Sequence, residues 1–206
     1  MIKNEPSGQA YSEIISYYDN DAAALSRRYE KLTFEIVHSD ILRYLPKPPG
    51  RAIDIGAGSG RDSEALRKLG FDVTAVEPSQ KMRELAKHQR ADDNIRWVDD
   101  TLPHLRRVDR RLQFVLVLVS AVWMHLRRQD QKQAMQTVFD LTAPGGRAFI
   151  SFRHASPHDK TTIYATKIEQ VRDDAVECGF TILQCSTTED LLGRPGTTWH
   201  SLILEK

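Results

Sequence analysis

The sequence contains little cysteine, no long hydrophobic run and almost no net charge. Its two cysteines, Cys178 and Cys185, form no CxxC pair, which argues against a zinc or disulfide scaffold and predicts free thiols in a reducing compartment. No apolar run reaches transmembrane length, and the first ten residues lack the apolar core of a signal peptide. The formal net charge of +1 gives no general attraction to DNA or to a membrane. We therefore expect a cytoplasmic protein with no metal site and no membrane association.

The hydrophobic pattern predicts an α/β protein in which strands alternate with helices. The length of 206 residues predicts a single domain over 1–206, with an N-terminal helical cap over 1–45 and a core over 50–206. Such alternation implies a mostly parallel sheet with helices on both faces and a ligand at the carboxyl ends of its strands. Strands are expected at 51–56, 71–77, 95–99, 113–121, 147–152, 180–187 and 198–205. Helices are expected at 11–19, 25–45, 61–70, 79–90, 128–141 and 164–175.

A glycine-rich turn follows the first predicted strand. Gly56, Gly58 and Gly60 allow backbone angles that other residues avoid, and they let a ligand approach main-chain atoms. The N-terminus of the next predicted helix offers free amides beside them. Glu77 ends the following strand, about twenty residues on, where a carboxylate accepts hydrogen bonds from a ribose diol. The alternative is that these glycines only shape a tight turn between strand and helix.

The spacing of this turn differs from two phosphate-binding motifs. A dinucleotide fingerprint has its third glycine three residues after the second, where this sequence has Arg61. The GK[ST] ending of a phosphate loop is absent. Asp54 precedes the glycines, and a carboxylate there suits an ammonium or ribose-bearing ligand better than a pyrophosphate. The residues therefore favour a nucleoside cofactor other than a dinucleotide.

Several segments together resemble the motifs of class I S-adenosylmethionine-dependent methyltransferases. "IDIGAGSGRD" is similar to the first motif of that family and "VTAVEPS" to its second strand. "IRWVDDTLP" resembles the stretch that contacts adenine, and "FVLVLVSAVWMHL" and "LTAPGGRAFISF" resemble the fourth strand and the approach to the fifth. The resemblance is strong over residues 50–153. It implies a Rossmann-like seven-stranded sheet of order 3-2-1-4-5-7-6 and methyl transfer from a sulfonium.

The resemblance also implies S-adenosyl-L-methionine as the cofactor and assigns residues to it. Glu77 would hold the ribose hydroxyls, although aspartate is frequent at this position in the family. Asp99 is expected to contact the adenine amine, with Asp100 beside it. Ser120 and Ala121 would flank the methionine moiety. The complete predicted cofactor set is Asp54, Gly56, Ala57, Gly58, Gly60, Glu77, Pro78, Asp99, Asp100, Ser120 and Ala121.

Candidate acceptor-side residues follow the fourth and fifth strands or lie in the cap. His125 is a candidate general base, or else a turn residue with a structural hydrogen bond. Arg153 and His154 could hold a carboxylate or phosphate of the acceptor, or could be solvated loop residues. Tyr18 and Arg28 of the cap are further candidates, and helix packing is the alternative for them.

The predicted reaction is methyl transfer to a small molecule. A sulfonium methyl is already activated, so in-line attack mainly needs positioning. The sequence lacks the [DNS]PP[YFW] motif of DNA amino-methyltransferases and the Pro-Cys of cytosine-C5 enzymes, so no DNA substrate is expected. The short connection after Phe152 favours a small acidic or aromatic metabolite. A protein or RNA methyltransferase with a docking partner, and a cofactor-binding regulatory protein without turnover, stay open as alternatives, as does the oligomeric state.

Overall fold

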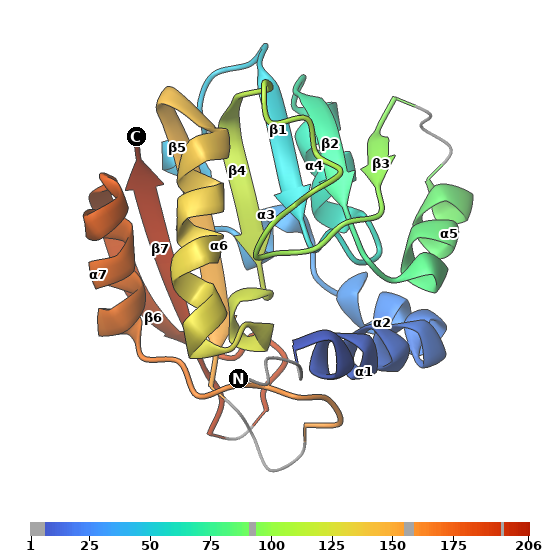
Figure 1. The fold of residues 1–206 in the computed structure, drawn as a ribbon. Coiled ribbons are helices and arrows are strands. Elements are labelled where there is room, and N and C mark those ends of the chain that lie inside the picture. The colour runs from blue at the N-terminus through green and yellow to red at the C-terminus, as the bar shows by residue number, and fades with distance from the viewer. Residues whose placement is uncertain (1–6, 91–93, 155–158, 195) are drawn as a thin grey trace.

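A seven-stranded sheet forms the centre of the protein in the computed structural model, which describes residues 7–90, 94–154, 159–194 and 196–206 (Figure 1). The strand order is β3-β2-β1-β4-β5-β7-β6, and β7 runs antiparallel to both β5 and β6. The other neighbouring strands pair in parallel. The strands are β1 Arg51–Ile55, β2 Asp72–Val76, β3 Arg96–Val98, β4 Phe114–Ser120, β5 Thr142–Arg153, β6 Thr181–Glu189 and β7 Thr198–Glu205. The predicted Rossmann-like sheet and its strand order are therefore confirmed.

Helices cover both faces of the sheet, because successive residues of a strand point to opposite faces. On β4, Val117 and Val119 lie in one buried core, whereas Leu116 and Leu118 lie in another. Helices α6 and α7 complete the first core, and α3 and α4 contribute to the second (Figure 1). The bounds of these four helices are α3 Phe34–Val37, α4 Arg61–Lys68, α6 Arg128–Leu141 and α7 Ile168–Cys178. A further helix, α5, spans Gln80–Gln89. Burial on both sides explains why β4 is apolar throughout.

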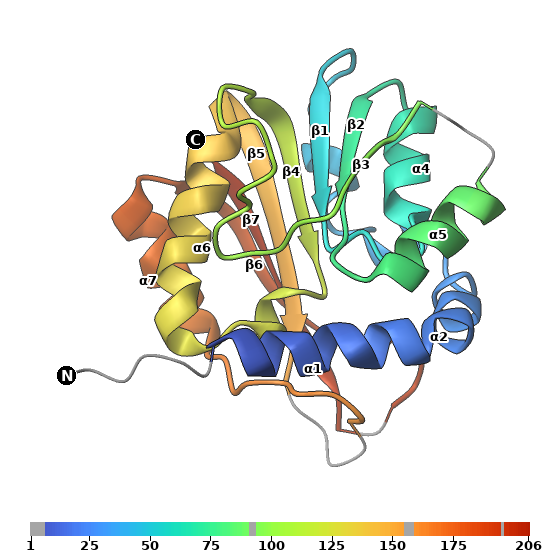
Figure 2. The same cartoon turned by 45° about the vertical axis from the view of Figure 1, so that its right-hand side comes forward.

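Helices α1 (Ser7–Asn20) and α2 (Ala22–Tyr29), together called the cap below, lie across the carboxyl ends of the strands (Figures 1 and 2). The Tyr11 hydroxyl donates to Asp130 Oδ2 at 3.0 Å, which ties α1 to α6. At the other end of α1, Asp19 Oδ1 accepts a hydrogen bond of 2.6 Å from Ser79 Oγ beside α5. The cap therefore covers the edge of the sheet at which a ligand is expected.

The prediction of one helix over 25–45 is wrong. Helix α2 ends at Tyr29, and a second short helix, α3, begins after Thr33, whose Oγ1 accepts a hydrogen bond from the Ile36 amide at 3.4 Å. The turn between them changes which side chains face inward. Ile36 is 48% exposed, whereas Phe34 is buried. A 3₁₀ helix, η1 (Leu42–Tyr44), completes this segment.

Two further boundaries differ from the expected ones. Tyr164 lies before α7 and not within it, and its amide donates to the Met124 carbonyl at 2.8 Å. Met124 belongs to η2 (Trp123–His125), the 3₁₀ helix that follows β4. Strand β5 begins at Thr142, earlier than residue 147, because Thr142 pairs with Phe114 across a register shift.

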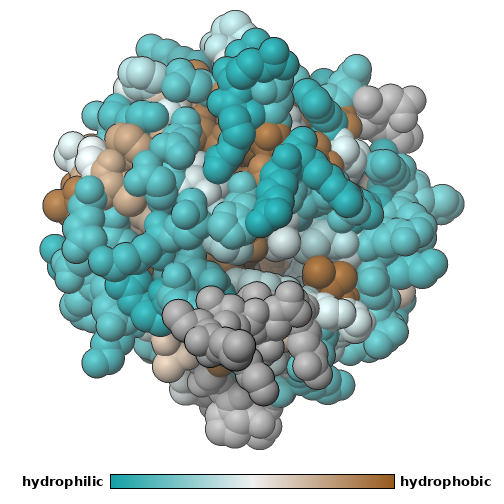
Figure 3. Space-filling model, in the orientation of Figure 1, coloured by the Kyte–Doolittle hydropathy of each residue, from teal (hydrophilic) through white to brown (hydrophobic). Residues whose placement is uncertain are grey.

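The outer surface seen in Figure 3 is mainly hydrophilic, with hydrophobic side chains exposed in small separate patches. In the described part of the chain, none of the helices has the length and apolar character needed to span a membrane.

Candidate cofactor and acceptor site

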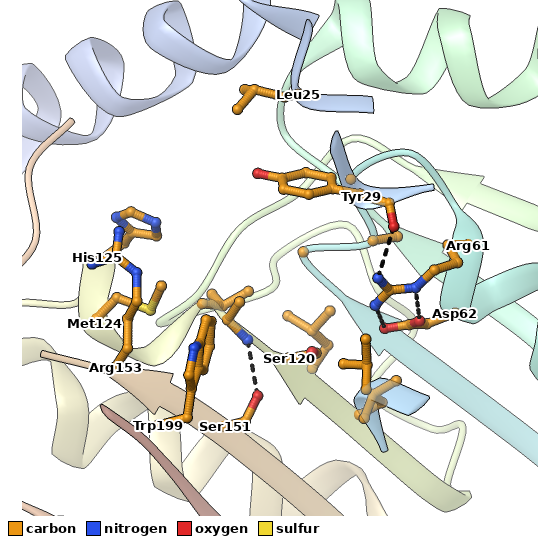
Figure 4. A pocket seen from close by; sticks show the side chains of 18 of the residues that line it. Leu25, Tyr29, Arg61, Asp62, Ser120, Met124, His125, Ser151, Arg153 and Trp199 are labelled. Atoms are coloured by element: carbon orange, nitrogen blue, oxygen red, sulfur yellow. Dashed lines mark hydrogen bonds and ion pairs between the residues drawn. The ribbon is translucent and has the colours of Figure 1, made fainter. Parts of the chain in front are cut away.

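A cavity of about 620 Å³ lies between the cap and the carboxyl ends of the strands. The turn after β1, the ends of β2 and β4, and residues of β7 line it from the core side. The cap and the segment that follows β5 line it from the other side. Figure 4 shows side chains from these elements facing the same space, among them Tyr29 and Arg61 on one side and His125 and Trp199 on the other.

The glycines of the turn after β1 have different local roles. The amides of Gly56 and Ala57 both donate to the Val76 carbonyl, at 2.7 and 2.9 Å, which joins the turn to the end of β2. Gly56, with φ of +77°, leaves no room for a side chain, since a Cβ there would be 2.2 Å from Val122 Cγ2. Gly58 has φ of +53° and room around its Cα on the cavity side. The backbone is therefore exposed to the cavity where the sequence predicted a ligand.

Gly60 does not line the cavity. It caps the N-terminus of α4 with φ of +79°, and a Cβ on it would lie 3.0 Å from Trp97 Cη2. Its predicted role as a cofactor contact is therefore replaced by a packing role.

Glu77 joins the glycine turn to the start of α5. Its side chain is buried, and Oε2 accepts a hydrogen bond from the Gly58 amide while Oε1 accepts one from the Ser79 amide, both at 2.8 Å. Burial raises the pKa of the carboxyl to about 7, although both amide donors act to lower it. Each carboxylate oxygen can accept a second hydrogen bond. A vicinal diol, which offers two O–H donors, fits this acceptor pair.

Asp54 belongs to a buried cluster of charged and polar side chains next to the glycine turn. Its other members are His38, Arg61, Asp62 and Ser63. Asp54 Oδ2 accepts a hydrogen bond of 2.6 Å from Ser63 Oγ, and burial, helped by the charge of Asp62, raises the pKa of Asp54 to about 7. Burial acts in the same direction on Asp62, but His38 at 2.9 Å and the guanidinium of Arg61 hold its pKa well below the usual range. All but Ser63 line the cavity, so the cluster presents both charge signs to a ligand.

The two neighbouring aspartates after β3 have opposite orientations to those expected. Asp99, the preferred adenine contact, does not line the cavity; its carboxylate is exposed and pairs with Arg83 at 3.2 Å and with Arg107. Asp100 lines the cavity, and its oxygens accept hydrogen bonds from the amides of Thr101 at 2.9 Å and Val108 at 3.2 Å. The structure therefore favours Asp100 as the acid on the cavity wall.

The ends of β4 and β5 line the cavity between the glycine turn and η2. Ser120 and Ala121 line it as expected, and so do Ala57 and Pro78. Ala121 has φ of +58°, and its amide donates to the Ser151 carbonyl at 3.1 Å. This positive φ turns the chain out of β4 and into η2, which carries His125.

His125 and Tyr18 were predicted as separate candidates, and the structure brings them together. The Tyr18 hydroxyl lies 3.0 Å from His125 Nε2, and His125 Nδ1 lies 2.8 Å from the Thr162 carbonyl oxygen. Burial lowers the pKa of His125 below its usual value and raises that of Tyr18 well above its own. Both residues line the cavity.

Arg153 lines the cavity, but its charge is matched within the protein. Its side chain is buried and donates to Asp159 Oδ2 at 2.9 Å in a two-armed ion pair. His154 is exposed, does not line the cavity, and lies with Nε2 2.8 Å from His200 Nε2. The expected Arg153–His154 clamp for an acidic acceptor is therefore not present. Arg28 of the cap does line the cavity.

Several cavity residues had been assigned to packing or not considered. Trp199 on β7 faces the cavity, with its Nε1 donating to Asp190 Oδ1 at 2.8 Å (Figure 4). His200 and Tyr29 also line the cavity. The alternation of β7 predicts which of its residues share a face, but not that the end of that strand reaches the ligand edge.

The chain matches the methyltransferase-domain family over residues 17–191. It is 26% identical over 148 residues to an uncharacterized methyltransferase from Alkaliphilus oremlandii, covering 68% of this chain and 61% of that protein. It is also 26% identical over 160 residues to a demethylmenaquinone methyltransferase from Renibacterium salmoninarum, covering 75% and 62%. The matched region thus spans about three fifths of the length of these two curated relatives.

The fold is similar to that of a solved methyltransferase from Burkholderia thailandensis. That structure is a 1,6-didemethyltoxoflavin-N1-methyltransferase with bound 1,6-didemethyltoxoflavin and S-adenosylhomocysteine. The TM-score is 0.76 at 18% identity, with 100% of this chain and 92% of the other covered. The chain therefore belongs to the methyltransferase-domain family and has the class I S-adenosylmethionine-dependent methyltransferase fold.

Alanine at Gly56 should destabilise the protein more than alanine at Gly58. Both positions have positive φ, which costs a non-glycine residue roughly 1–2 kcal/mol. Gly56→Ala also forces a Cβ against Val122, and overpacking adds about 1–3 kcal/mol. Chemical denaturation of the two variants measures this difference. Equal losses would show that Val122 moves aside without cost.

Glu77→Gln should become more stable relative to the parent as pH rises. The folded pKa of about 7 exceeds the ordinary value of 4.5, so the parent retains this stability contribution below pH 4.5 and loses it as pH rises through 7. The loss amounts to about 3 kcal/mol, because one pKa unit corresponds to about 1.4 kcal/mol. Glutamine does not ionise and escapes this loss. Denaturant unfolding of both proteins between about pH 5 and 8 tests it; parallel stability curves would mean that Glu77 ionises normally.

Proposed function

We propose that the protein transfers a methyl group from S-adenosylmethionine to a small-molecule acceptor. One observation carries this proposal: the buried Glu77 carboxylate bridges the amides of Gly58 and Ser79 at the edge of a covered cavity. A paired carboxylate beside an open glycine turn suits a ribose diol, and the dinucleotide spacing is absent. The cofactor, when bound, supplies a methyl group on a positively charged sulfur.

The residues that would hold the cofactor surround one half of the cavity. Glu77 would accept the ribose hydroxyl protons, and the exposed backbone at Gly56 and Gly58 would permit close approach of the nucleoside. In the cluster of Asp54, Asp62 and Arg61, the guanidinium of Arg61 is already paired with Asp62, so Asp54 is the acid that would accept a hydrogen bond from the ammonium group of the amino acid moiety. The further cofactor-side candidates on the cavity wall are Ala57, Pro78, Asp100, Ser120 and Ala121.

The covered cavity favours a small acceptor over a macromolecule. The cap and residues Asp159, Lys160 and Thr161 after β5 line the cavity opposite the carboxyl ends of the strands, so the space is covered on that side. Figure 2 shows α1 lying across these strand ends. Because Arg153 is paired with Asp159, the acceptor needs no acidic group to balance a buried cation. This favours a neutral aromatic acceptor over an acidic one, in line with the heteroaromatic bound by the Burkholderia thailandensis neighbour.

A protein or RNA acceptor is the alternative to be tested. One structural neighbour, a putative methyltransferase from Haloferax volcanii, was solved in complex with the Trm112 methyltransferase activator; its TM-score is 0.71 at 15% identity. We propose that DNA is not a substrate of this chain. Cytoplasmic location stays a prediction.

S-adenosylhomocysteine should bind to the purified protein, and NAD should not. Glu77→Ala should weaken binding at least tenfold with the fold intact, because a hydrogen bond to a charged group contributes about 1.5–3 kcal/mol. Titration calorimetry measures both ligands, and circular dichroism checks the variant. Asp99→Ala is the matched control, since it removes an acid outside the cavity. Tight NAD binding without binding of S-adenosylhomocysteine would contradict the proposal.

Release of S-adenosylhomocysteine during turnover identifies the acceptor class. The proposal expects release with small neutral aromatic compounds and none with duplex DNA. Turnover only with a peptide or with transfer RNA would replace the small-molecule proposal by the macromolecular alternative. Binding of the cofactor without turnover of any of these acceptors would favour a regulatory protein.

A further inference from the structure

A hydrogen-bonded chain of three groups runs from the cap into the core across the acceptor half of the cavity. It consists of the Tyr18 hydroxyl, the His125 imidazole and the Thr162 carbonyl, with separations of 3.0 Å and 2.8 Å. Tyr18 comes from α1, His125 from the end of η2, and Thr162 from the segment before α7. His125 is 8% exposed, so bulk water does not compete freely for its ring nitrogens.

The partners of His125 determine where its proton lies. A carbonyl oxygen only accepts, so Nδ1 must carry the hydrogen that it donates to Thr162. In the neutral ring, Nε2 then has a free lone pair and accepts the hydrogen of the Tyr18 hydroxyl. The Tyr18 side chain also hydrogen-bonds with Tyr29, which leaves one lone pair of its oxygen for a cavity ligand, and Tyr18 lines the cavity. The chain is thus arranged to accept a proton from a cavity ligand at Tyr18 and to store it at His125.

We propose that Tyr18 and His125 form a proton relay that removes the proton of a neutral protic acceptor, such as a phenol or an N–H heteroaromatic compound. The inference rests on the proposed function. As the acceptor atom bonds to the methyl carbon, the carbon–sulfur bond breaks and its electron pair stays on sulfur. The acceptor proton passes to the Tyr18 oxygen while the original Tyr18 proton passes to His125 Nε2. Tyr18 ends as a neutral hydroxyl and His125 as an imidazolium, which later loses its proton to water.

The charged groups around the relay suit this direction of transfer. Arg153 and Asp159 act on His125 with opposite signs, so the imidazolium forms beside an ion pair and not beside an unbalanced charge. Burial keeps His125 neutral at physiological pH by lowering its pKa. Tyr17, Tyr29 and Glu77 act on Tyr18, and together with burial they hold its pKa well above 10. Tyr18 therefore transmits a proton but does not itself ionise.

The walls near the relay fit a planar acceptor. Met124, Arg153 and Trp199 lie on the same side of the cavity as His125, with the Trp199 ring facing the space between them (Figure 4). An indole ring offers a flat apolar surface to an aromatic acceptor. An acceptor that is already ionised, such as a thiolate, would bind there without needing the relay.

The tautomer of His125 can be tested without any acceptor. Nitrogen-15 NMR of the histidine ring at neutral pH should show a neutral imidazole with the proton on Nδ1, in the parent and in Tyr18→Phe. An Nε2–H tautomer or an imidazolium at neutral pH would overturn the relay. Calorimetry with S-adenosylhomocysteine should give equal affinities for the parent, Tyr18→Phe and His125→Asn. Absence of binding to the parent would contradict the proposed function and not the relay.

Turnover with two acceptor classes tests the chemistry. Asparagine at position 125 keeps an N–H donor for Thr162 and removes the base. With phenols and N–H heteroaromatics, His125→Asn and Tyr18→Phe should lower kcat at least about a hundredfold, the usual scale of general base catalysis. With thiophenols, which are largely ionised above neutral pH, both variants should stay close to the parent. Ser26→Ala removes a hydroxyl contact of the cap, to Gln89 Oε1 at 3.1 Å, that lies outside the cavity; this variant is the matched control and should behave as the parent.

The pH profile separates a relay from a structural role. With a phenol, kcat of the parent should rise with pH through the lowered pKa of His125, below 6.5, and then level off. In His125→Asn this limb should vanish, and the rate should instead follow ionisation of the phenol. Parent-like rates of both variants with every protic acceptor would overturn the proposal, as would equal losses with phenols and thiophenols or turnover of thiophenols alone by the parent.

Discussion

The buried carboxylate of Glu77 is the contact on which the rest of the site depends. It accepts hydrogen bonds from the amides of Gly58 and Ser79 and so links the turn after β1 to the start of α5. Ser79 Oγ in turn donates a hydrogen bond to Asp19 at the end of α1. As the N-cap residue of α5, Ser79 also accepts a hydrogen bond from the Met82 amide. One side chain therefore connects the cofactor edge of the sheet to the helices that cover it. The raised pKa of Glu77 follows from the same burial that makes this connection possible.

The two halves of the cavity use buried charge in different ways. On the proposed cofactor half, Asp54 and Glu77 have pKa values raised to about 7, so hydrogen-bond donors or positive charge from a ligand favour their ionised forms. On the acceptor half, Arg153 and Asp159 neutralise each other, and His125 is held uncharged. Under the proposed function, an incoming cationic cofactor is attracted to the first half, whereas a neutral acceptor enters the second without leaving a buried charge unpaired.

Sequence reasoning predicted the sheet, and most of the residues it assigned to the cofactor line one cavity, because both depend on local patterns. The β1 turn, Glu77 at the end of β2 and the apolar β4 are each encoded within a few neighbouring residues, and their relative positions follow from parallel strand order. The cap shows the limit of such patterns. An apolar periodicity over 25–45 cannot reveal that Thr33 starts a new helix and leaves Ile36 exposed, because tertiary contacts of Phe34 decide which face turns inward.

The acceptor half could not be predicted in the same way, because its contacts join residues far apart in the chain. Tyr18 and His125 are separated by 107 positions, and no local pattern pairs them. The sequence identified Arg153 as a polar residue at a strand end but could not show its ion pair with Asp159; in the proposed function, this pairing favours the aromatic over the acidic member of the two acceptor classes predicted. The glycine turn and Glu77 lie at the ends of neighbouring strands, whereas the Tyr18–His125 contact joins chain segments that only the three-dimensional structure brings together.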